Sequence, residues 1–340
     1  MTLQTMKRVI SLLPSAAEIV ALVAGDNLTV QLVGRSHEDD YPASVNNLPI
    51  LTAPKTKFTT TADVDTQVSQ FLAQGNSLYT LDTEKLKSLN PDIIVTQDLC
   101  HVCSVDLNMV QRIAKEMDPV PTIVALNPMS LDDVIKSIDD VGSALDMVNE
   151  SNLVKSKLLS RVKYARDIAF QSHTAGKKRS RVAFLEWPSP IYLGGHWTPQ
   201  MIRWSNAKIV TYIFHAFLIS KGVQVVNDCK DGETAEMGAP PSFRVPPQDV
   251  IDSHPEILII CPCGLNLEAT RKEYEETLLP SEWWPKLAEN ATKIALMFNR
   301  PGPRLVDALE WLVGYINDIP EMIPGNFPLT QNPSKFLFGI

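Results

Sequence analysis

Short apolar runs alternate with stretches of helical periodicity along most of this chain, and the alternation restricts the folds open to it. Each run has the length of a strand, and the segments between runs place apolar residues three or four positions apart, as an amphipathic helix does. Regular alternation of strand and helix predicts an α/β protein with parallel sheets. The predicted strands are RVISLL, LTVQLVG, DIIVTQ and PTIVAL in the first part and RVAFLEW, EILIICPCG and KIALMFN in the second. The predicted helices include AAEIVALVA, DTEKLKSL and a final one beginning near PRLVDALEWLVGYI.

The middle of the chain has a helical pattern throughout. Ser130 and Asp133 form a predicted capping box, and apolar residues recur behind it at helical spacing as far as Val148, which predicts one long helix. A second helical pattern follows over residues 158–169. We therefore expect an N-terminal α/β lobe over residues 1–128, a linking helix and a following helix over 129–172, and a C-terminal α/β lobe over 173–340.

Composition and charge exclude some classes of partner. The chain has 340 residues, 44% of them hydrophobic, which is enough for two sizeable cores. Its net charge of -8 and the lack of a dense Lys/Arg cluster argue against a nucleic-acid partner. Five cysteines, an odd number with two close pairs, do not resemble a disulfide framework.

The stretch MKRVISLLPSAAEIVALVAG, residues 6–25, imitates a secretory signal, because Lys7 and Arg8 precede an apolar run. Pro14, Ser15 and Glu18 interrupt that run, so a strand followed by a helix is the better interpretation. No run has the length and apolar character of a membrane span. We expect a soluble cytoplasmic protein with no membrane insertion, or a periplasmic or extracellular one if a leader precedes this sequence.

The carboxyl ends of the predicted strands carry the candidate site residues. Ligands of open parallel sheets bind at these ends, where loops present side chains that regular structure cannot. Ser15 follows the first strand and is expected to cap the next helix, while Asp39, Asp40 and Pro42 are expected to form a solvated acidic turn. The candidate ligand-binding residues are Ser15, His37, Glu38, Tyr41, Tyr79, Gln97, Trp187, His196, Trp197, Asn299 and Arg300.

Aromatic residues gather around the glycines of LGGHW. Trp187 and Trp197 fit two interpretations equally well: ordinary core aromatics, or flat apolar walls for a large planar ligand that the glycines allow to approach the backbone.

Two cysteine pairs also follow strands. Cys100 and Cys103 in CHVC and Cys261 and Cys263 in CPC, together with His196, are candidate zinc or iron ligands if the two lobes face each other. The alternative is that they are small buried thiols that pack at the strand ends. No phosphate loop, zinc-protease helix or nucleophile elbow is present in the sequence, which argues against the common enzyme classes.

Several of these segments resemble one known family. RVISLLPSAAEIVALV, LVGRSHEDDYP, SLYTLDTEKLKSLNPDIIVTQDLCHVC, RVAFLEWPSPIYLGGHW and RPGPRLVDALEWL are similar to the vitamin B12 and iron-siderophore substrate-binding proteins of class III ABC importers. The similarity is greatest to the cobalamin-binding branch that lacks an evident export signal.

The resemblance implies two Rossmann-like lobes with parallel sheets joined by a single long helix, with a ligand in the cleft between the lobes. The ligand it implies is cobalamin, another corrinoid or a different metal chelate, and the partner it implies is an ABC permease. Without an export signal the permease partner stays open. Residues 208–222 depart from the family pattern as an extra β-rich apolar tract.

Three hypotheses follow for the function. The first is a non-catalytic corrinoid-type binding protein, with Trp187, Trp197 and Tyr41 as walls, Gln97 and Ser15 as hydrogen-bonding groups, and His196 or His37 as an axial ligand to cobalt. The second is a metal-binding or thiol-dependent enzyme that uses the cysteine pairs in the same cleft. The third is an interaction protein that has lost its ligand.

Overall fold

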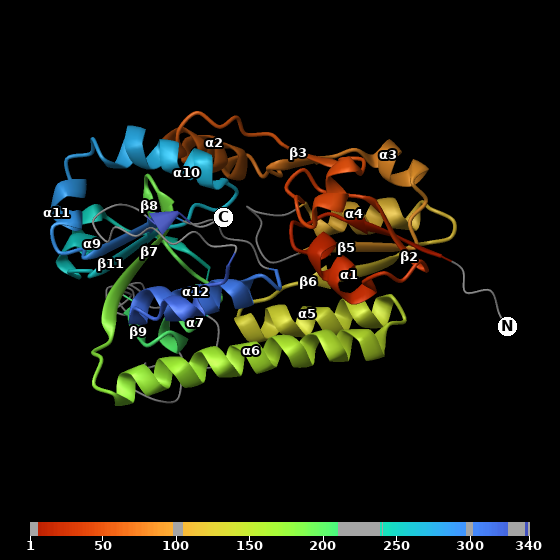
Figure 1. Cartoon of the computed structure of the whole chain (residues 1–340). Helices are drawn as coiled ribbons and strands as arrows, with labels where there is room; N and C mark the ends of the chain where they lie inside the picture. Colours follow the sequence, from red (N-terminus) through yellow and green to blue (C-terminus); the bar gives the residue numbers. More distant parts are fainter. Residues whose placement is uncertain are drawn as a thin grey trace, which may run out of the picture.

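The computed structural model describes residues 6–97, 105–209, 239, 241–296, 302–325 and 337–338. Two α/β lobes lie side by side, and helix α6, Val148–Thr174, runs along one side of both (Figure 1). Among the described helices, none is long and apolar enough to cross a bilayer. The candidate residues Cys100, Cys103, Asn299 and Arg300 lie outside the described residues, as does the tract at residues 208–222 apart from Lys208 and Ile209.

The N-terminal lobe contains a parallel sheet with the strand order β2-β1-β5-β6. Every residue of β5 is buried, as expected for a central strand covered by helices on both faces. Its strands are β1 Lys7–Ser11, β2 Val30–Gly34, β5 Ile93–Gln97 and β6 Thr122–Leu126. Its helices are α1 Ala16–Ala24, η1 Ala43–Asn47, α3 Thr83–Ser88 and α4 Leu107–Lys115. A small antiparallel pair, β3 Thr52–Pro54 and β4 Tyr79–Leu81, brackets helix α2, Thr61–Ala73.

The C-terminal lobe contains a mixed sheet with the order β10-β8-β7-β11-β12-β13, and β9 also pairs with β7. The sheet is parallel from β7 through β11 and β12 to β13, as expected, and strands β8 and β10 add an antiparallel edge to it. Its strands are β7 Ser180–Pro188, β8 Ile191–Leu193, β9 Ala207–Ile209, β10 Phe243–Arg244, β11 Ile257–Ile260, β12 Lys293–Leu296 and β13 Leu337–Phe338. Its helices are α7 Thr198–Trp204, α9 Pro247–Asp252, α10 Leu267–Glu273, η2 Tyr274–Leu278, α11 Trp284–Ala288, α12 Leu305–Asn317 and η3 Pro320–Met322.

The helical middle differs from its prediction. The capping box of Ser130 and Asp133 is present and starts α5, Leu131–Ala144, but this helix ends before Val148. Asp146 adopts a left-handed φ of 59°, and the chain turns there into α6. The long helix that spans both lobes is therefore the second one, of 27 residues, and the prediction of one long helix starting at Ser130 is wrong.

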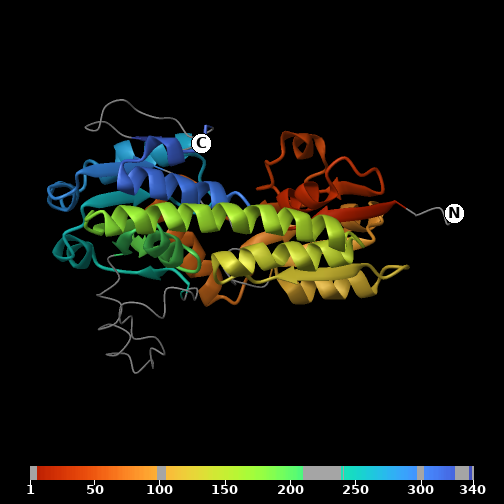
Figure 2. The ribbon, with the colours of Figure 1, turned by 60° about the horizontal axis from the view of Figure 1, so that its bottom comes forward.

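Helix α6 packs on α5 near one end and on α12 near the other, as a second view shows (Figure 2). Gly142 of α5 contacts Ser151 of α6 so closely that a Cβ at residue 142 would clash with Ser151 Cβ and Oγ. Arg161 of α6 forms ion pairs with Asp307 at 2.5 Å and Glu310 at 2.6 Å, both on α12, and these raise the pKa of its guanidinium. These contacts fix the position of α6 on both lobes.

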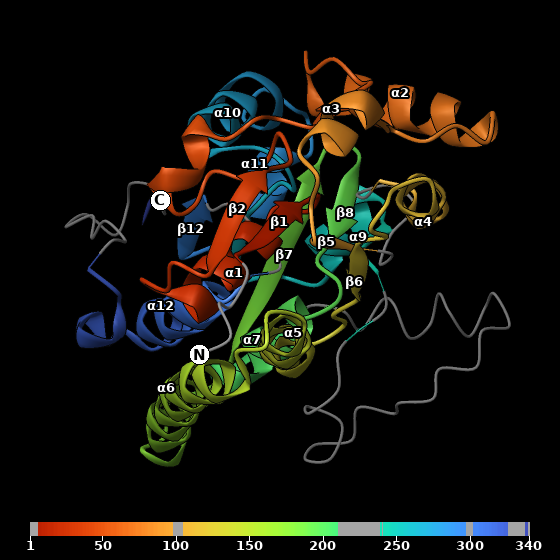
Figure 3. The ribbon, with the colours of Figure 1, turned by 90° about the vertical axis from the view of Figure 1, so that its right-hand side faces the viewer.

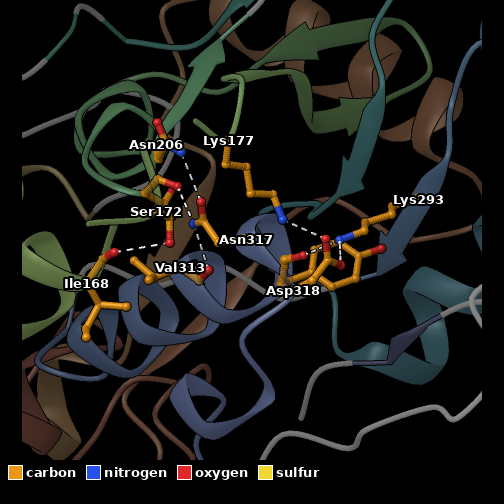
Figure 4. Close-up of polar contacts among 10 residues, drawn as sticks. Ile168, Ser172, Lys177, Asn206, Lys293, Val313, Asn317 and Asp318 are labelled. Atoms are coloured by element: carbon orange, nitrogen blue, oxygen red, sulfur yellow. Dashed lines mark hydrogen bonds and ion pairs between the residues drawn. The ribbon is translucent and has the colours of Figure 1, made fainter. Parts of the chain in front are cut away.

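The end of α12 is held by a polar cluster of the C-terminal lobe (Figure 4). Asp318 accepts from Lys177 at 2.6 Å and from Lys293 at 2.5 Å. Burial would raise the pKa of Asp318, but the hydrogen bonds from these two lysines lower it below its usual value. Asn317 donates to the carbonyls of Ser205 and Val313, which ties α12 to the turn after α7.

A buried ion pair joins the two lobes directly. Glu18 of α1 accepts from the backbone N–H of Arg304 at 2.8 Å and from its Nε at 2.9 Å. The Glu18 side chain is 5% exposed, and burial raises its pKa although Arg304 opposes that shift. Gly302 leaves the space, because a Cβ at residue 302 would lie 3.0 Å from Glu18 Oε2.

Replacing Gly142 by alanine tests the close contact of α5 with α6. Gly142→Ala should lower the free energy of unfolding by about 1–3 kcal/mol, because the new methyl group must displace Ser151 in a packed interface. Denaturant unfolding measures this change. Gly325→Ala is the matched control, since nothing lies near a Cβ at that position. Adding Ser151→Gly should restore stability, and equal stability of Gly142→Ala and the wild type would contradict the contact.

Replacing Glu18 by glutamine tests the protonation of the buried carboxyl. Because the pKa of Glu18 is raised in the folded state, that state binds its proton more tightly, and the contribution of Glu18 to stability falls as the pH rises through the raised pKa. The stability advantage of the wild type over Glu18→Gln should therefore shrink as the pH rises above the usual pKa of a glutamate carboxyl group. Denaturant unfolding over a series of pH values measures it, and an advantage that grows with pH would show that pairing with Arg304 outweighs burial.

Candidate functional site

His37, Glu38 and Tyr79 are brought together beyond the end of β2. Thr52 Oγ1 lies 3.0 Å from the backbone N of His37 and 2.7 Å from its Nδ1, so β3 orients the imidazole. His37 Nε2 lies 4.0 Å from Glu38 Oε1, and the rings of His37 and Tyr79 are 5.4 Å apart. The imidazole and the Glu38 carboxylate are each about one quarter exposed, so both groups remain accessible from solvent.

The turn that carries these residues is held in place by hydrogen bonds. Asp39 is fully buried, and its Oδ2 accepts from the backbone N–H of Ser36. Arg35 donates from Nη1 to the carbonyl oxygens of Asp39 at 2.6 Å and Ser36 at 3.2 Å. The expectation of a solvated turn is therefore wrong for Asp39, although Asp40 is exposed. The turn holds His37 and Glu38 in a fixed backbone frame.

Ser15, Tyr41 and Gln97 lie on the same lobe. Ser15 is buried at the start of α1, but its side chain makes no capping hydrogen bond, so that expectation is wrong. Tyr41 is half exposed, with the guanidinium of Arg304 stacked 4.2 Å from its ring centre. Gln97 is buried as the last residue of β5, directly before residues 98–104, which the structure does not describe.

The strand ends of the C-terminal lobe approach this group. Glu186 Oε2 accepts from the backbone N–H of Gly195. The backbone carbonyl of Glu186 accepts from the backbone N–H of Cys263 at 3.2 Å. Next to Cys263, Gly264 has a left-handed φ of 76°, and a Cβ there would lie 3.4 Å from Glu38 Oε1. The strand-end turns of the two lobes therefore meet at Glu38 and Gly264.

Trp187 and Trp197 have different environments. Trp187 is half buried and donates from Nε1 to the carbonyl of Thr61 at 3.0 Å, which places it against the other lobe. Trp197 is 6% exposed and belongs to the apolar core at the start of α7. Of these two tryptophans, only Trp187 has a side chain that is partly exposed to solvent.

His196 is a buried imidazole next to Trp197. Its backbone has a left-handed φ of 51°, and its ring stacks on that of Trp197 with centres 5.4 Å apart. Its Nε2 is buried and has no hydrogen-bond partner within the described part of the chain. Burial lowers its pKa, so the imidazole is held neutral.

The described cysteines are both free thiols. Cys261 is buried, and burial raises its pKa well above the usual value, so it remains a thiol; Cys263 is exposed. Over the described residues, no cluster of three or more His, Cys, Asp or Glu side chains is arranged to hold a metal ion. A zinc or iron site that includes Cys100 and Cys103 stays a prediction.

Sequence reasoning missed the residues that join the lobes next to this site. They are Glu18, Thr61, Asp65 and Glu273. Each is a common residue whose role depends on a partner distant in the chain. The sequence therefore offered no local signal for them.

Among comparisons with known proteins, only those with solved structures find matches to this chain. No family model matches the sequence, and no curated protein matches it. Solved structures do match. The periplasmic heme-binding protein BhuT, in complex with two hemes, has a TM-score of 0.62 and 17% identity over 92% of this chain and 99% of its own.

Two further structures agree with this match. The periplasmic heme-binding protein RhuT from Roseiflexus sp. RS-1 has a TM-score of 0.59 and 17% identity over 92% of this chain and 99% of its own. The periplasmic vitamin B12-binding protein BtuF of Vibrio cholerae has a TM-score of 0.56 and 17% identity over 93% of this chain and 98% of its own. The predicted fold is thus confirmed: the chain has the two-lobed, helical-backbone fold of the substrate-binding proteins of class III ABC importers.

Proposed function

We propose that this protein binds a corrinoid or another metal chelate between its two lobes and catalyses no reaction. Solved proteins of the same fold bind heme or vitamin B12, which supports a ligand of this class. The observation that carries the proposal is the approach of the two lobes at their strand ends, where Glu38 Oε1 of one lobe lies 3.4 Å from the position that a Cβ on Gly264 of the other would take. In open parallel sheets such ends are where ligands bind.

Side chains at this junction suit a large, planar, partly polar ligand. Trp187, Tyr41 and Tyr79 supply aromatic surface, and Ser15 and Gln97 supply hydrogen-bonding groups in this proposal. His37 is the better candidate for an axial metal ligand, because Thr52 orients its ring through Nδ1. His196 is neutral, as a ligand must be, but its buried ring would have to become accessible first.

A metal-binding or thiol-dependent enzyme is the weaker alternative. A reactive cysteine needs a thiolate, and the pKa of Cys261 is raised, which favours the unreactive thiol.

We also propose delivery of the ligand to an ABC permease in a periplasmic setting. The matched proteins are periplasmic binding proteins, and the comparisons give no support to the expectation of a cytoplasmic location.

Titration with cyanocobalamin, hydroxocobalamin and hemin tests the proposed function. One of the three should bind with a dissociation constant on the order of 1 μM or tighter, as measured by calorimetry on protein shown to be folded. A neutral imidazole that coordinates the metal should shift the visible spectrum of hydroxocobalamin or hemin. If none of the three binds, only the fold is shared with the matched proteins and this function is wrong.

Substitutions at His37 and Thr52 test the axial-ligand assignment. His37→Ala should abolish the spectral shift of the bound ligand, and Thr52→Val should weaken binding about tenfold because the ring loses its orienting partner. His173→Ala, at the exposed end of α6, is the matched control and should leave both unchanged. A bound ligand with the wild-type spectrum in His37→Ala would exclude His37 as the ligand.

A further inference from the structure

Helix α2 belongs to the N-terminal lobe but contacts the C-terminal lobe. It lies in the excursion between β3 and β4, which pair with each other at Thr52–Leu81 and at Pro54–Tyr79. In Figure 1 it lies next to α10, on the opposite side of the molecule from α6, and Figure 3 also shows α2 on the side away from α6. The lobes are therefore connected on two opposite sides, by α6 and by α2.

Thr61, the first residue of α2, is the main attachment point. Its backbone N–H donates to Glu273 Oε1 at 3.2 Å, and its hydroxyl donates to the same oxygen. Its carbonyl accepts from Trp187 Nε1 at 3.0 Å. Thr61 is fully buried and Glu273 is 4% exposed, so these hydrogen bonds are shielded from water. Glu273, at the end of α10, thus satisfies free N-terminal groups of a helix from the other lobe.

A second attachment lies one turn further along α2. Asp65 Oδ1 accepts from the Tyr192 hydroxyl of β8 at 3.0 Å, and Asp65 Oδ2 lies 4.0 Å from Arg244 of β10. Burial and the bond to Asp65 raise the pKa of Tyr192. Beyond Thr61 every residue of α2 is half-buried or exposed, so polar contacts rather than a core fix this helix to the C-terminal lobe.

The two connections differ in strength. Along α6 the lobes share an apolar core, and separating them there would expose buried side chains. At α2 a few hydrogen bonds hold them, and these can break and re-form without unfolding either lobe. A ligand seated between the lobes would therefore leave most readily past α2.

We propose that α2 is an interlobe strap that positions Trp187 and gates ligand exchange. Thr61 is a positioning residue in this role, because its carbonyl holds the indole that the proposed function uses as an aromatic wall. Detachment of Thr61 and Asp65 frees both Trp187 and the side of the molecule opposite α6. The inference rests on the proposed function only for its gating part, since the strap itself exists without ligand.

The strap is tested first without ligand. The double variant Thr61→Val with Tyr192→Phe removes two hydroxyl donors at little cost in volume. Amide hydrogen exchange over residues 61–73 should become at least about tenfold faster. The fluorescence of Trp187, obtained by subtracting the spectrum of Trp187→Phe, should shift to longer wavelength. Glu273→Ala removes the acceptor of Thr61 and should change the amide exchange and the Trp187 emission in the same direction. It shows whether the effect depends on the contact rather than on the particular substitutions of the double variant.

Matched controls separate the strap from general loosening. Thr66→Val and Glu276→Ala are the control variants. Thr66 lies on α2, and Glu276 follows the acceptor Glu273 three residues later in the chain. Both side chains are exposed. Both variants should leave the exchange of residues 61–73 and the Trp187 emission unchanged. Unchanged exchange in the double variant and in Glu273→Ala would overturn the strap.

Gating is tested with the probe that binds in the titration. The dissociation rate of that compound (cyanocobalamin, hydroxocobalamin or hemin), measured by stopped-flow displacement, should rise about tenfold in the double variant and not in Thr66→Val. Faster amide exchange with an unchanged dissociation rate would overturn the gating while leaving the strap. If none of the three compounds of the titration binds the wild type, the proposed function and the gating both fail, and the ligand-free measurements still decide the strap.

Discussion

One apolar core runs through both lobes, and the arrangement of every other part depends on it. It contains Val9 and Ile93 of the first sheet, Val182 and Ile259 of the second, and the inner faces of α1, α5, α6, α7 and α12. Burial of apolar surface stabilises by about 25 cal/mol per Å², so opening the lobes along this side would be costly. The lobes are thereby restricted to small relative movements, and polar contacts away from the core set their final orientation.

Those polar contacts are pairs of groups distant in the chain. Glu18 with Arg304, Thr61 with Glu273, and Asp65 with Tyr192 each join one lobe to the other. The carboxyl groups of Glu18 and Glu273 are buried and would lose their partners if the lobes moved apart, so both contacts favour one relative position of the lobes. These pairs lie close to the strand ends where a ligand is proposed, so in that proposal ligand binding and lobe position would be coupled.

Sequence periodicity predicted the elements that local patterns determine. Helix α1 has the expected bounds at Ala16–Ala24, and the capping box at Ser130 is present, because an apolar face and a cap are encoded within a few residues. The break after Ala144 was missed, since Leu145 and Val148 continue the apolar spacing across a turn that Asp146 makes without a glycine. The antiparallel β8 and the placement of α2 depend on contacts between distant segments, which no local pattern carries.

The two candidate histidines show why a site is harder to predict than a fold. Both follow strands, and the sequence alone does not distinguish them. In the structure, His37 is oriented by Thr52 of strand β3. His196 is instead buried against Trp197 and has a left-handed backbone conformation. A metal ligand must be neutral, accessible and held by a second partner. His196 meets the first requirement through burial and fails the second for the same reason. His37 meets the second and third through contacts that only the folded chain supplies, so in the proposed function it would not need a rearrangement of the core to coordinate a metal chelate.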